Sequence, residues 1–494
     1  MMKEKSLVRI IETTLENFKN ISYGNIRYFN RSSVERNAEI ISGDINGIYG
    51  ANGSGKTAVI ESLDMLQHIL CGESVPFSEY EGMFSDSEDM RLGTVFFVEN
   101  KDEQFKVAYD LKLRKNEEDR RIQIQSEQIQ YWIKGTTWKE KHEFFFVNPF
   151  YDLDNVISNE PANVISSNIK PASQIRYFGV LQNLAVFCAQ KNCSLFFNKQ
   201  FIKAVYPKNG NEEERKFSVI VKALFDFAQM SFQVVKVNQL GDNYANRIIP
   251  VNVHTETENE ILKGCIPLLV SGSGEFPETI YLRLVKIIDA INIALKAIIP
   301  NLKLELHKIS EEINKDGIKV VQAKVFSIRD GKIFSTKYES AGIKRIISLL
   351  NYLISVYNDS AICLVVDELD AGIFEYLLGE LIGELSEGAK GQLIFTSHNL
   401  RIMEKLDKKN IICSTINPNN RYISLKGIEK THNRRDFYIR TLILGGQNER
   451  IYDDTDLQDI GYAFSKAGNP ESEQTNTGFS AEFLELLKES SSNR

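Results

Sequence analysis

The spacing of apolar residues predicts an α/β protein with the same kind of order at both ends of the chain. Strands are predicted over Leu7–Leu15 and Ile45–Tyr49, and helical spacing predicts a helix over Lys56–Leu70. The unbroken apolar runs Ala361–Val366 and Gln392–Thr396 are typical of buried parallel strands. Two helices are predicted beside these runs, over Ile343–Tyr357 and Tyr376–Leu385. Alternating strands and helices indicate helices layered on a sheet.

The middle of the chain separates these two α/β ends. Four β-type runs between Gly93 and Phe146 predict an antiparallel sheet. Residues 148–300 are predicted to be mainly helical, with helical runs over Lys216–Val235 and Ile280–Ile299. β-type patterns then return from Leu302. The expected parts are 1–147, 148–300, 301–430 and a C-terminal extension 431–494, with a polar connection over Ala467–Thr477 and a short helix over Ala481–Leu487.

Composition and charge narrow the class of protein. The chain is 43% hydrophobic and 25% charged, as globular proteins are, and its net charge of −7 argues against a basic nucleic-acid coat protein. The charge is uneven: Arg401–Arg450 carries +6 and the acidic tail Ile451–Arg494 carries −6. Six scattered cysteines, Cys188 and Cys193 being the nearest pair, predict neither a disulfide scaffold nor a zinc site. Without a signal peptide or membrane-spanning run, we expect a cytoplasmic protein.

The segment Gly50–Thr57 carries the clearest chemical signal. It reads GANGSGKT, fits the pattern G-x-x-x-x-G-K-[ST], and lies between a predicted strand and a predicted helix. Lys56 supplies a positive charge for the β- and γ-phosphates of ATP, and Thr57 supplies a hydroxyl for Mg²⁺. Backbone N–H groups surround the phosphates at the helix N-terminus, and the residues expected to contribute them are Gly50, Asn52, Gly53, Ser54 and Gly55.

Two later strands end in polar residues that suit the same chemistry. Asp367 and Glu368 directly follow an apolar run, where Asp367 can support the metal and Glu368 can polarise a water in line with the γ-phosphate. His398 follows the run Gln392–Thr396 and can donate to the γ-phosphate. The position of both strands after the P-loop favours these roles over solvated strand ends.

A fourth motif, Tyr338–Arg345, reads YESAGIKR and precedes a helix. The N-terminus of that helix can meet an anion. Because the P-loop already holds the phosphates of its own subunit, Ser340 and Gly342 are expected to close over ATP bound by another subunit. The alternative is that Ser340 is an ordinary N-cap.

Together the four motifs resemble the ABC-type ATPases of the soluble RecF, SMC and OLD kind. Within these, the chain is most similar to the compact group labelled AAA15 or AbiEii-like ATPases. The resemblance is carried by L-x-N-F-K-N at Leu15–Asn20, E-S-x-G-x-K-R at Glu339–Arg345 and D-E-L-D at Asp367–Asp370, and it covers about a third of the chain. It implies an α/β fold, that of a P-loop NTPase of ABC-ATPase type, with a mixed sheet, an antiparallel β subdomain and a helical insertion.

The resemblance also implies roles for single residues. Glu368 is implied to be the catalytic base and His398 the switch histidine, with Thr57 and Asp367 at the metal. Ser340 and Gly342 are implied to contact the γ-phosphate in trans, and Asp370 begins the loop that faces the dimer partner. The signature is not LSGGQ, which argues against a transporter. Phe374-Glu375 stand where members often have His-Pro, and the Q-loop glutamine is not placed, Gln182 being one candidate.

Two function hypotheses follow. The first is an ATPase that forms a homodimer or higher homo-oligomer around ATP and gates a separately encoded effector, a nuclease, in anti-phage defence. The absence of heptads between P-loop and signature argues against SMC-type coiled coils, and Asp454-Thr455-Asp456 follows no apolar strand that a fused nuclease would need. An effector on another chain is therefore expected, and the defence role is what the resemblance implies. The alternative is a RecF-like repair ATPase, which would bind bare duplex DNA with strong salt dependence. A scaffold that binds ATP without turnover is disfavoured by Glu368.

A basic run near the C-terminus is the expected contact for DNA or an acidic partner. Scattered solvated side chains are the equally weighted alternative. Its members are Lys405, Lys408, Lys409, Arg421, Lys426, Lys430, Arg434, Arg435 and Arg440.

Overall fold

The computed structural model divides into two compact units, Met1–Tyr452 and Asp453–Arg494. The terminal helix predicted over Ala481–Leu487 and most of the connection before it lie outside the described residues. None of the helices in the described part combines the length and apolar character that crossing a membrane requires. The described residues are 6–28, 43–85, 88–101, 103–134, 138–147, 169–170, 178–205, 212–236, 248–256, 261–269, 272–313, 315, 317–427, 433–453 and 456–468.

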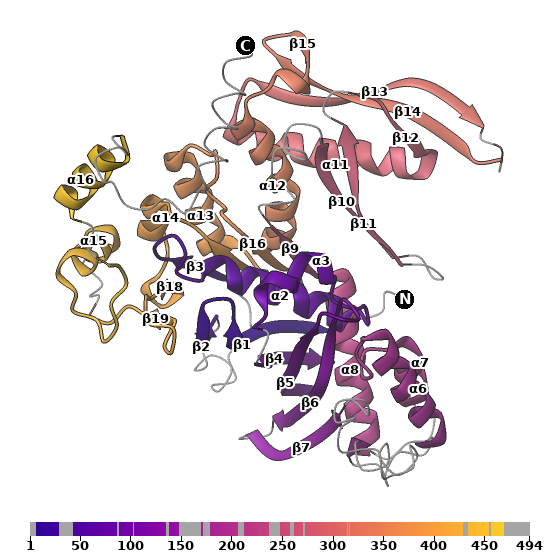
Figure 1. The fold of residues 1–494 in the computed structure, drawn as a ribbon. Coiled ribbons are helices and arrows are strands. Elements are labelled where there is room, and N and C mark those ends of the chain that lie inside the picture. Colours follow the sequence, from indigo (N-terminus) through magenta and orange to yellow (C-terminus); the bar gives the residue numbers. More distant parts are fainter. Residues whose placement is uncertain are drawn as a thin grey trace, which may run out of the picture. The chain divides into compact units, whose positions relative to one another are not determined.

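A six-stranded mixed sheet forms the centre of the larger unit (Figure 1). Its strands run parallel from β18 through β3, β17 and β16 to β9, and β19 joins antiparallel at the edge. The predicted α/β class with a mixed sheet is therefore confirmed. In sheet order the strands are β19 (Tyr422–Ser424), β18 (Ile411–Ser414), β3 (Asp44–Tyr49), β17 (Gln392–Thr396), β16 (Cys363–Val366) and β9 (Phe232–Val235).

Helices cover both faces of this sheet because its strands are apolar on both sides. Along β16, Cys363 and Val365 pack into one hydrophobic core, and Leu364 and Val366 pack into the other. The first core includes α2 (Lys56–Leu70) and α8 (Glu212–Met230). The second includes α11 (Glu278–Ile298), α12 (Ala341–Asn358), α13 (Glu375–Gly388) and α14 (Leu400–Lys405).

A seven-stranded antiparallel sheet packs on the first core, as the sequence predicts (Figure 1). Its order is β2-β1-β4-β5-β6-β7-β8. The strands are β1 (Leu7–Phe18), β2 (Ile21–Arg27), β4 (Met90–Asn100), β5 (Glu103–Asn116), β6 (Arg121–Lys134), β7 (Trp138–Val147) and β8 (Ile169–Lys170). Short helices accompany it, namely α3 (Phe77–Tyr80), η1 (Glu81–Met83), α6 (Phe178–Lys191) and α7 (Lys199–Val205).

The segment predicted to be mainly helical also contains strands. The helical run predicted to Val235 is wrong at its end, because α8 stops at Met230 and Phe232–Val235 forms β9. The boundaries of the four expected parts stay predictions. The further strands are β10 (Ile248–Glu256), β11 (Ile261–Leu269) and β12 (Gly274–Pro277), followed by the long hairpin β13 (Leu302–Ile313) and β14 (Lys319–Arg329) with β15 (Lys332–Ser335).

Four short elements complete the chain. They are η3 (Thr336–Tyr338), η4 (Lys408–Asn410), α15 (Arg434–Leu444) and, in the smaller unit, α16 (Leu457–Gly468). The side chains of Tyr462 and Phe464 on α16 are exposed within that unit.

Two buried polar side chains join β1 of the antiparallel sheet to the central sheet. Gln392, at the start of β17, accepts from the N–H of Ile10 at 3.0 Å and donates to its carbonyl at 2.8 Å. Arg9 donates to the carbonyl of Lys390 at 2.6 Å and lies 3.7 Å from Asp44. The two sheets are thereby joined by residues that lie 382 positions apart in sequence.

We expect Gln392→Leu to lower the free energy of unfolding by about 2–4 kcal/mol, because the buried N–H and C=O of Ile10 lose their partner. Denaturant titration followed by circular dichroism measures this. Gln200→Leu, at an exposed position on α7, is the control and should change stability by no more than about 0.5 kcal/mol. Equal losses in both variants would contradict the structural role of Gln392.

Candidate nucleotide site

The loop Gly50–Thr57 connects β3 to α2 and has the geometry of an anion site. A Cβ atom on Gly50, whose φ is 151°, would lie 2.0 Å from Ser414 Oγ, so a larger residue does not fit there. The helix begins after Gly55, whose φ is 91°. Because a glycine N-cap offers no side-chain acceptor, the first N–H groups of α2 remain available to a phosphate.

The ammonium group of Lys56 is folded back over this loop. Its Nζ donates to the carbonyls of Gly50 at 2.9 Å and Ala51 at 2.8 Å. Burial lowers the pKa of Lys56, while the carboxylates of Asp367 and Glu368 act in the opposite direction. Lys56 therefore lies where its charge offsets acidic groups on a neighbouring strand.

Asp367 connects the P-loop to the strands beside it. Its Oδ1 accepts from Thr57 Oγ1 at 3.4 Å and from Thr396 Oγ1 at 2.6 Å. A hydroxyl and a single carboxylate fit Mg²⁺, which takes most of its ligands from phosphates and waters. The structure thus brings together the two residues predicted at the metal, although they are 310 positions apart.

Glu368 has a strained backbone that two hydrogen bonds hold in place. Its φ is +44°, a conformation that costs a non-glycine residue about 1–3 kcal/mol and that is concentrated at functional sites. The N–H of Glu368 donates to Thr396 Oγ1 at 2.7 Å, and its carbonyl accepts from Arg345 at 2.9 Å. Burial lowers the pKa of Arg345 to about 10, so this guanidinium remains charged at neutral pH.

His398 follows β17 and faces the same hollow. Its backbone N–H donates to Asp370 Oδ2 at 3.2 Å. Burial and the charge of Lys56 lower the pKa of His398, so its imidazole is neutral at pH 7. The hollow has a volume of about 330 Å³ and is lined by Lys19, Asn20, Asn52, Gly53, Gly55, Lys56, Thr57, Ala58, Glu368, Thr396 and His398.

The predicted signature residues lie outside this hollow. Ser340 and Gly342 are not among its lining residues, and Ser340 is exposed at the N-cap of α12. Its Oγ accepts from the N–H of Ile343 at 3.3 Å, so the expected capping role is present. A Cβ on Gly342 would lie 2.3 Å from the carbonyl oxygen of Gly372, which packs the first turn of α12 against the loop after Asp370.

Sequence reasoning gave no role to two residues that organise the site. Thr396 ends an apolar strand, and Arg345 is the last residue of the E-S-x-G-x-K-R motif, but the sequence indicated no task for either side chain. Thr396 contacts both acidic residues of the site, and Arg345 donates to the carbonyls of both. Lys19 and Asn20 carried part of the family resemblance, and the structure places them in the lining of the hollow.

The predicted basic run does not form one continuous free surface. Arg421 and Arg434 donate to backbone carbonyls at 2.7 and 2.6 Å, and Lys405 pairs with Glu380 at 2.9 Å. Lys430 lies outside the described residues.

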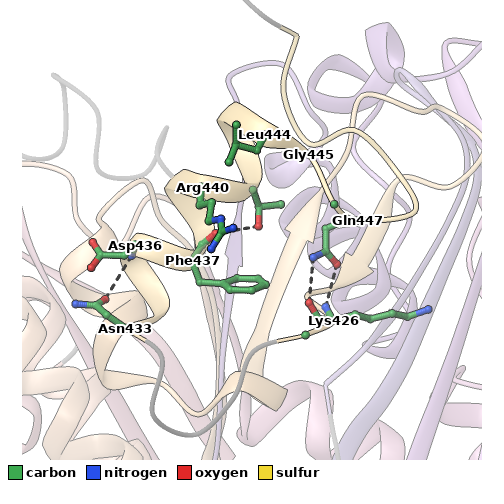
Figure 2. A pocket seen from close by; sticks show the side chains of 11 residues that line it. Lys426, Asn433, Asp436, Phe437, Arg440, Leu444, Gly445 and Gln447 are labelled. Atoms are coloured by element: carbon green, nitrogen blue, oxygen red, sulfur yellow. Dashed lines mark hydrogen bonds between the residues drawn. The ribbon is translucent and has the colours of Figure 1, made fainter.

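Two members of this run, Lys426 and Arg440, line a separate hollow of about 550 Å³ beside α15, together with Phe437 and Leu444 (Figure 2). Gln447 closes one side of it, because it accepts from the N–H of Lys426 at 2.9 Å and donates to its carbonyl at 3.0 Å. None of the residues that line this hollow also lines the nucleotide hollow.

Comparison with known proteins gives one family match and several likenesses in structure. The family described as "AAA domain, putative AbiEii toxin, Type IV TA system" matches residues 45–173. The SMC head domain from Thermotoga maritima is 14% identical, with a TM-score of 0.36 over 85% of this chain and 100% of that one. The Smc head domain with an extended coiled coil, bound to the C-terminal domain of ScpA and derived from Pyrococcus furiosus, is 15% identical, with a TM-score of 0.38 over 85% and 96%.

A structure of the recombination mediator protein RecF-ATPrS in the RecFOR pathway is 14% identical, with a TM-score of 0.34 over 85% of this chain and 99% of that one. No curated protein matches the chain. The chain's own sheet order, its site and the family match point to the same class of protein. These define a P-loop ATPase of the ABC type, as the motifs predict.

We expect Thr396→Val to reduce the rate of ATP hydrolysis by about 10- to 100-fold, because both hydrogen bonds that orient Asp367 and Glu368 are lost while the shape of the side chain is kept. Thr396→Ser retains the hydroxyl and should stay close to wild type. Steady-state phosphate release measures both variants. A Val variant as active as the Ser variant would show that the hydroxyl does not position the acidic pair.

Proposed function

We propose that this ATPase binds and hydrolyses ATP between two copies of the chain and thereby gates a separately encoded effector, a nuclease, in anti-phage defence. One observation carries the dimeric part: Ser340 and Gly342 do not line the hollow that contains the P-loop of their own chain. A helix N-terminus with an exposed Ser suits a phosphate, and a second copy can bring it to one.

In this proposal the residues that carry the predicted chemistry have defined tasks. The P-loop N–H groups and Lys56 bind the phosphates, and Thr57 and Asp367 hold Mg²⁺, which neutralises phosphate charge when bound. Glu368 accepts a proton from the attacking water. The neutral imidazole of His398 donates a hydrogen bond to the γ-phosphate. Thr396 and Arg345 hold the backbone of Glu368 in its strained conformation and so fix where its side chain leaves the main chain.

The effector and the defence role are supported by less direct observations. The matching family is described by a toxin of a type IV toxin–antitoxin system, and its match covers the P-loop part. Asp454-Thr455-Asp456 follows no apolar strand of the kind a fused nuclease would need, and in this proposal a second protein supplies the nuclease activity. We place this pair in the cytoplasm, where the free cysteines, including buried Cys188 and Cys193, stay reduced.

The second candidate is a RecF-like repair ATPase that binds DNA through the basic run. The exposed side chains of Lys426, Arg435 and Arg440 favour it, since charge of this kind contacts phosphates. Against it, Arg421, Arg434 and Lys405 already have partners within the fold. These internal contacts leave fewer free cations for DNA, which is our reason for proposing effector gating first.

We expect Glu368→Gln to lower ATP turnover by about 100-fold or more while leaving ATP binding intact, because the water is no longer deprotonated. With Mg²⁺ and ATP this variant should accumulate as a dimer or higher oligomer in sedimentation velocity. Lys56→Ala should keep the oligomeric state that it has without nucleotide. A Glu368→Gln variant that hydrolyses ATP at the wild-type rate would refute the assignment of the base.

Mixing two inactive variants tests the contribution of the second copy. Lys56→Ala removes phosphate binding and Ser340→Arg blocks the signature, yet a mixed dimer retains one site with both elements intact. We expect about a quarter of wild-type activity at equal concentrations if copies pair at random and each site acts independently, an order-of-magnitude figure for shared sites. Absence of recovery in mixed dimers that are shown to form would refute the trans arrangement.

A further inference from the structure

Large aromatic side chains lie exposed on both sides of the Gly342–Gly372 contact. Tyr338 is 78% exposed and precedes Ser340 by two residues. Phe374 is 71% exposed, follows Gly372 by two residues and forms the N-cap of α13. We call Tyr338 and Phe374, with the 56% exposed Tyr376, the aromatic surface.

The packing of the main chain keeps this surface in one place. The first turn of α12 touches the loop before α13, because the carbonyl of Gly372 leaves no room for a Cβ on Gly342. Arg345, one turn further along α12, donates to the carbonyls of Asp367 and Glu368. The segments that carry Tyr338 and Phe374 are thus attached to each other and to Asp367 and Glu368, which follow β16.

The same loop continues into the nucleotide hollow. His398 lines that hollow, and its N–H donates to Asp370, the residue at which the loop begins. These contacts connect the P-loop hollow, through Asp370 and Gly372, to the segments that carry Phe374, Ser340 and Tyr338. One end of this connected set is the hollow, and the other carries the aromatic rings and the N-terminus of α12, which Ser340 caps.

A two-fold axis would allow these two ends to meet in a pair of copies. When the phosphate-binding end of one copy meets the signature end of another, the same contact arises twice. Interface centres are rich in Phe and Tyr, and charged residues lie at their rims. The exposed charged residues Lys337 and Glu375 neighbour these rings in sequence. Single exposed apolar side chains are common, but several large ones beside an incomplete site indicate a contact surface.

We propose that Phe374, supported by Tyr338, is the apolar anchor through which one copy of this chain contacts a second copy around ATP. This inference rests on the proposed function, because it specifies which side chains bury surface when the two copies close. Burial of these rings adds affinity that is independent of the nucleotide contacts of Ser340. It also explains why a ring is kept in water at a helix N-cap, where Phe offers no capping acceptor.

The test uses the full chain in the Glu368→Gln background with Mg²⁺ and ATP, and sedimentation velocity gives the dimer dissociation constant. Phe374→Ser should weaken the dimer more than tenfold, and Phe374→Tyr, which keeps the ring, should stay within about threefold of the parent. Leu444→Ser is the matched control, since Leu444 is also 71% exposed and lies on α15 (Figure 2). Tyr338→Ser should weaken the dimer in the same direction as Phe374→Ser.

Binding of a fluorescent ATP analogue to each variant, at concentrations too low for dimers, should be unchanged and shows that the P-loop site is folded. If Phe374→Ser and Leu444→Ser both dimerise as tightly as the parent, the aromatic anchor is refuted while the ATP-dependent dimer stands. If the Glu368→Gln parent stays monomeric at saturating ATP, the proposed function itself is refuted, and the anchor with it.

Discussion

Strand β17 is the element on which both the fold and the site depend. Gln392 at its start holds Ile10 of the antiparallel sheet through two hydrogen bonds. Thr396 at its end holds Asp367 and the N–H of Glu368. At about 3.3 Å per residue the two ends of this five-residue strand are roughly 13 Å apart. The strand therefore fixes the distance between the contact with the antiparallel sheet and the acidic pair. The neighbouring P-loop strand β3 pairs with the same five residues.

Beyond this strand the site contains several buried charged side chains, each of which needs polar partners. Asp367, Lys56 and Arg345 are all largely buried, and a buried charge without a partner destabilises a fold strongly. Arg345 meets this requirement through the carbonyls of Asp367 and Glu368. Arg345 lies five residues after the exposed Ser340, so the same two hydrogen bonds attach helix α12 to the segment that follows β16. The backbone of Glu368 is therefore connected through Arg345 to the helix that begins at Ser340.

The sequence predicted what depends on local pattern and left open what depends on packing. Helix α2 was predicted over Lys56–Leu70 and strand β17 over Gln392–Thr396, and the structure has both with the same bounds. In contrast, the run Lys216–Val235 was taken as one helix, although its last four residues form β9. A short apolar run fits a buried strand or a helix equally well, and pairing with Cys363–Val366 decides between them.

Thr396 and Arg345 show the same limit within the site. A threonine at the end of a strand is ordinary by composition, and Arg345 was recognised only as part of a motif, so the contacts in the folded chain assign each of them its task. The motifs, by comparison, were visible because phosphate binding requires particular residues at fixed spacing along a single loop. The meeting of Thr57 with Asp367 was expected from those motifs, but its distance follows from the order of strands in the sheet.

Ser340 can cap its own helix and also contact a phosphate. As an N-cap its Oγ accepts from the N–H of Ile343, which accounts for the residue in purely structural terms. A serine hydroxyl, however, has one donor hydrogen as well as acceptor lone pairs, and the cap uses only an acceptor. The O–H can still donate to a phosphate oxygen, and the cap itself orients it at the helix N-terminus, where an anion is favoured. Capping the helix therefore prepares Ser340 for a phosphate and does not compete with it.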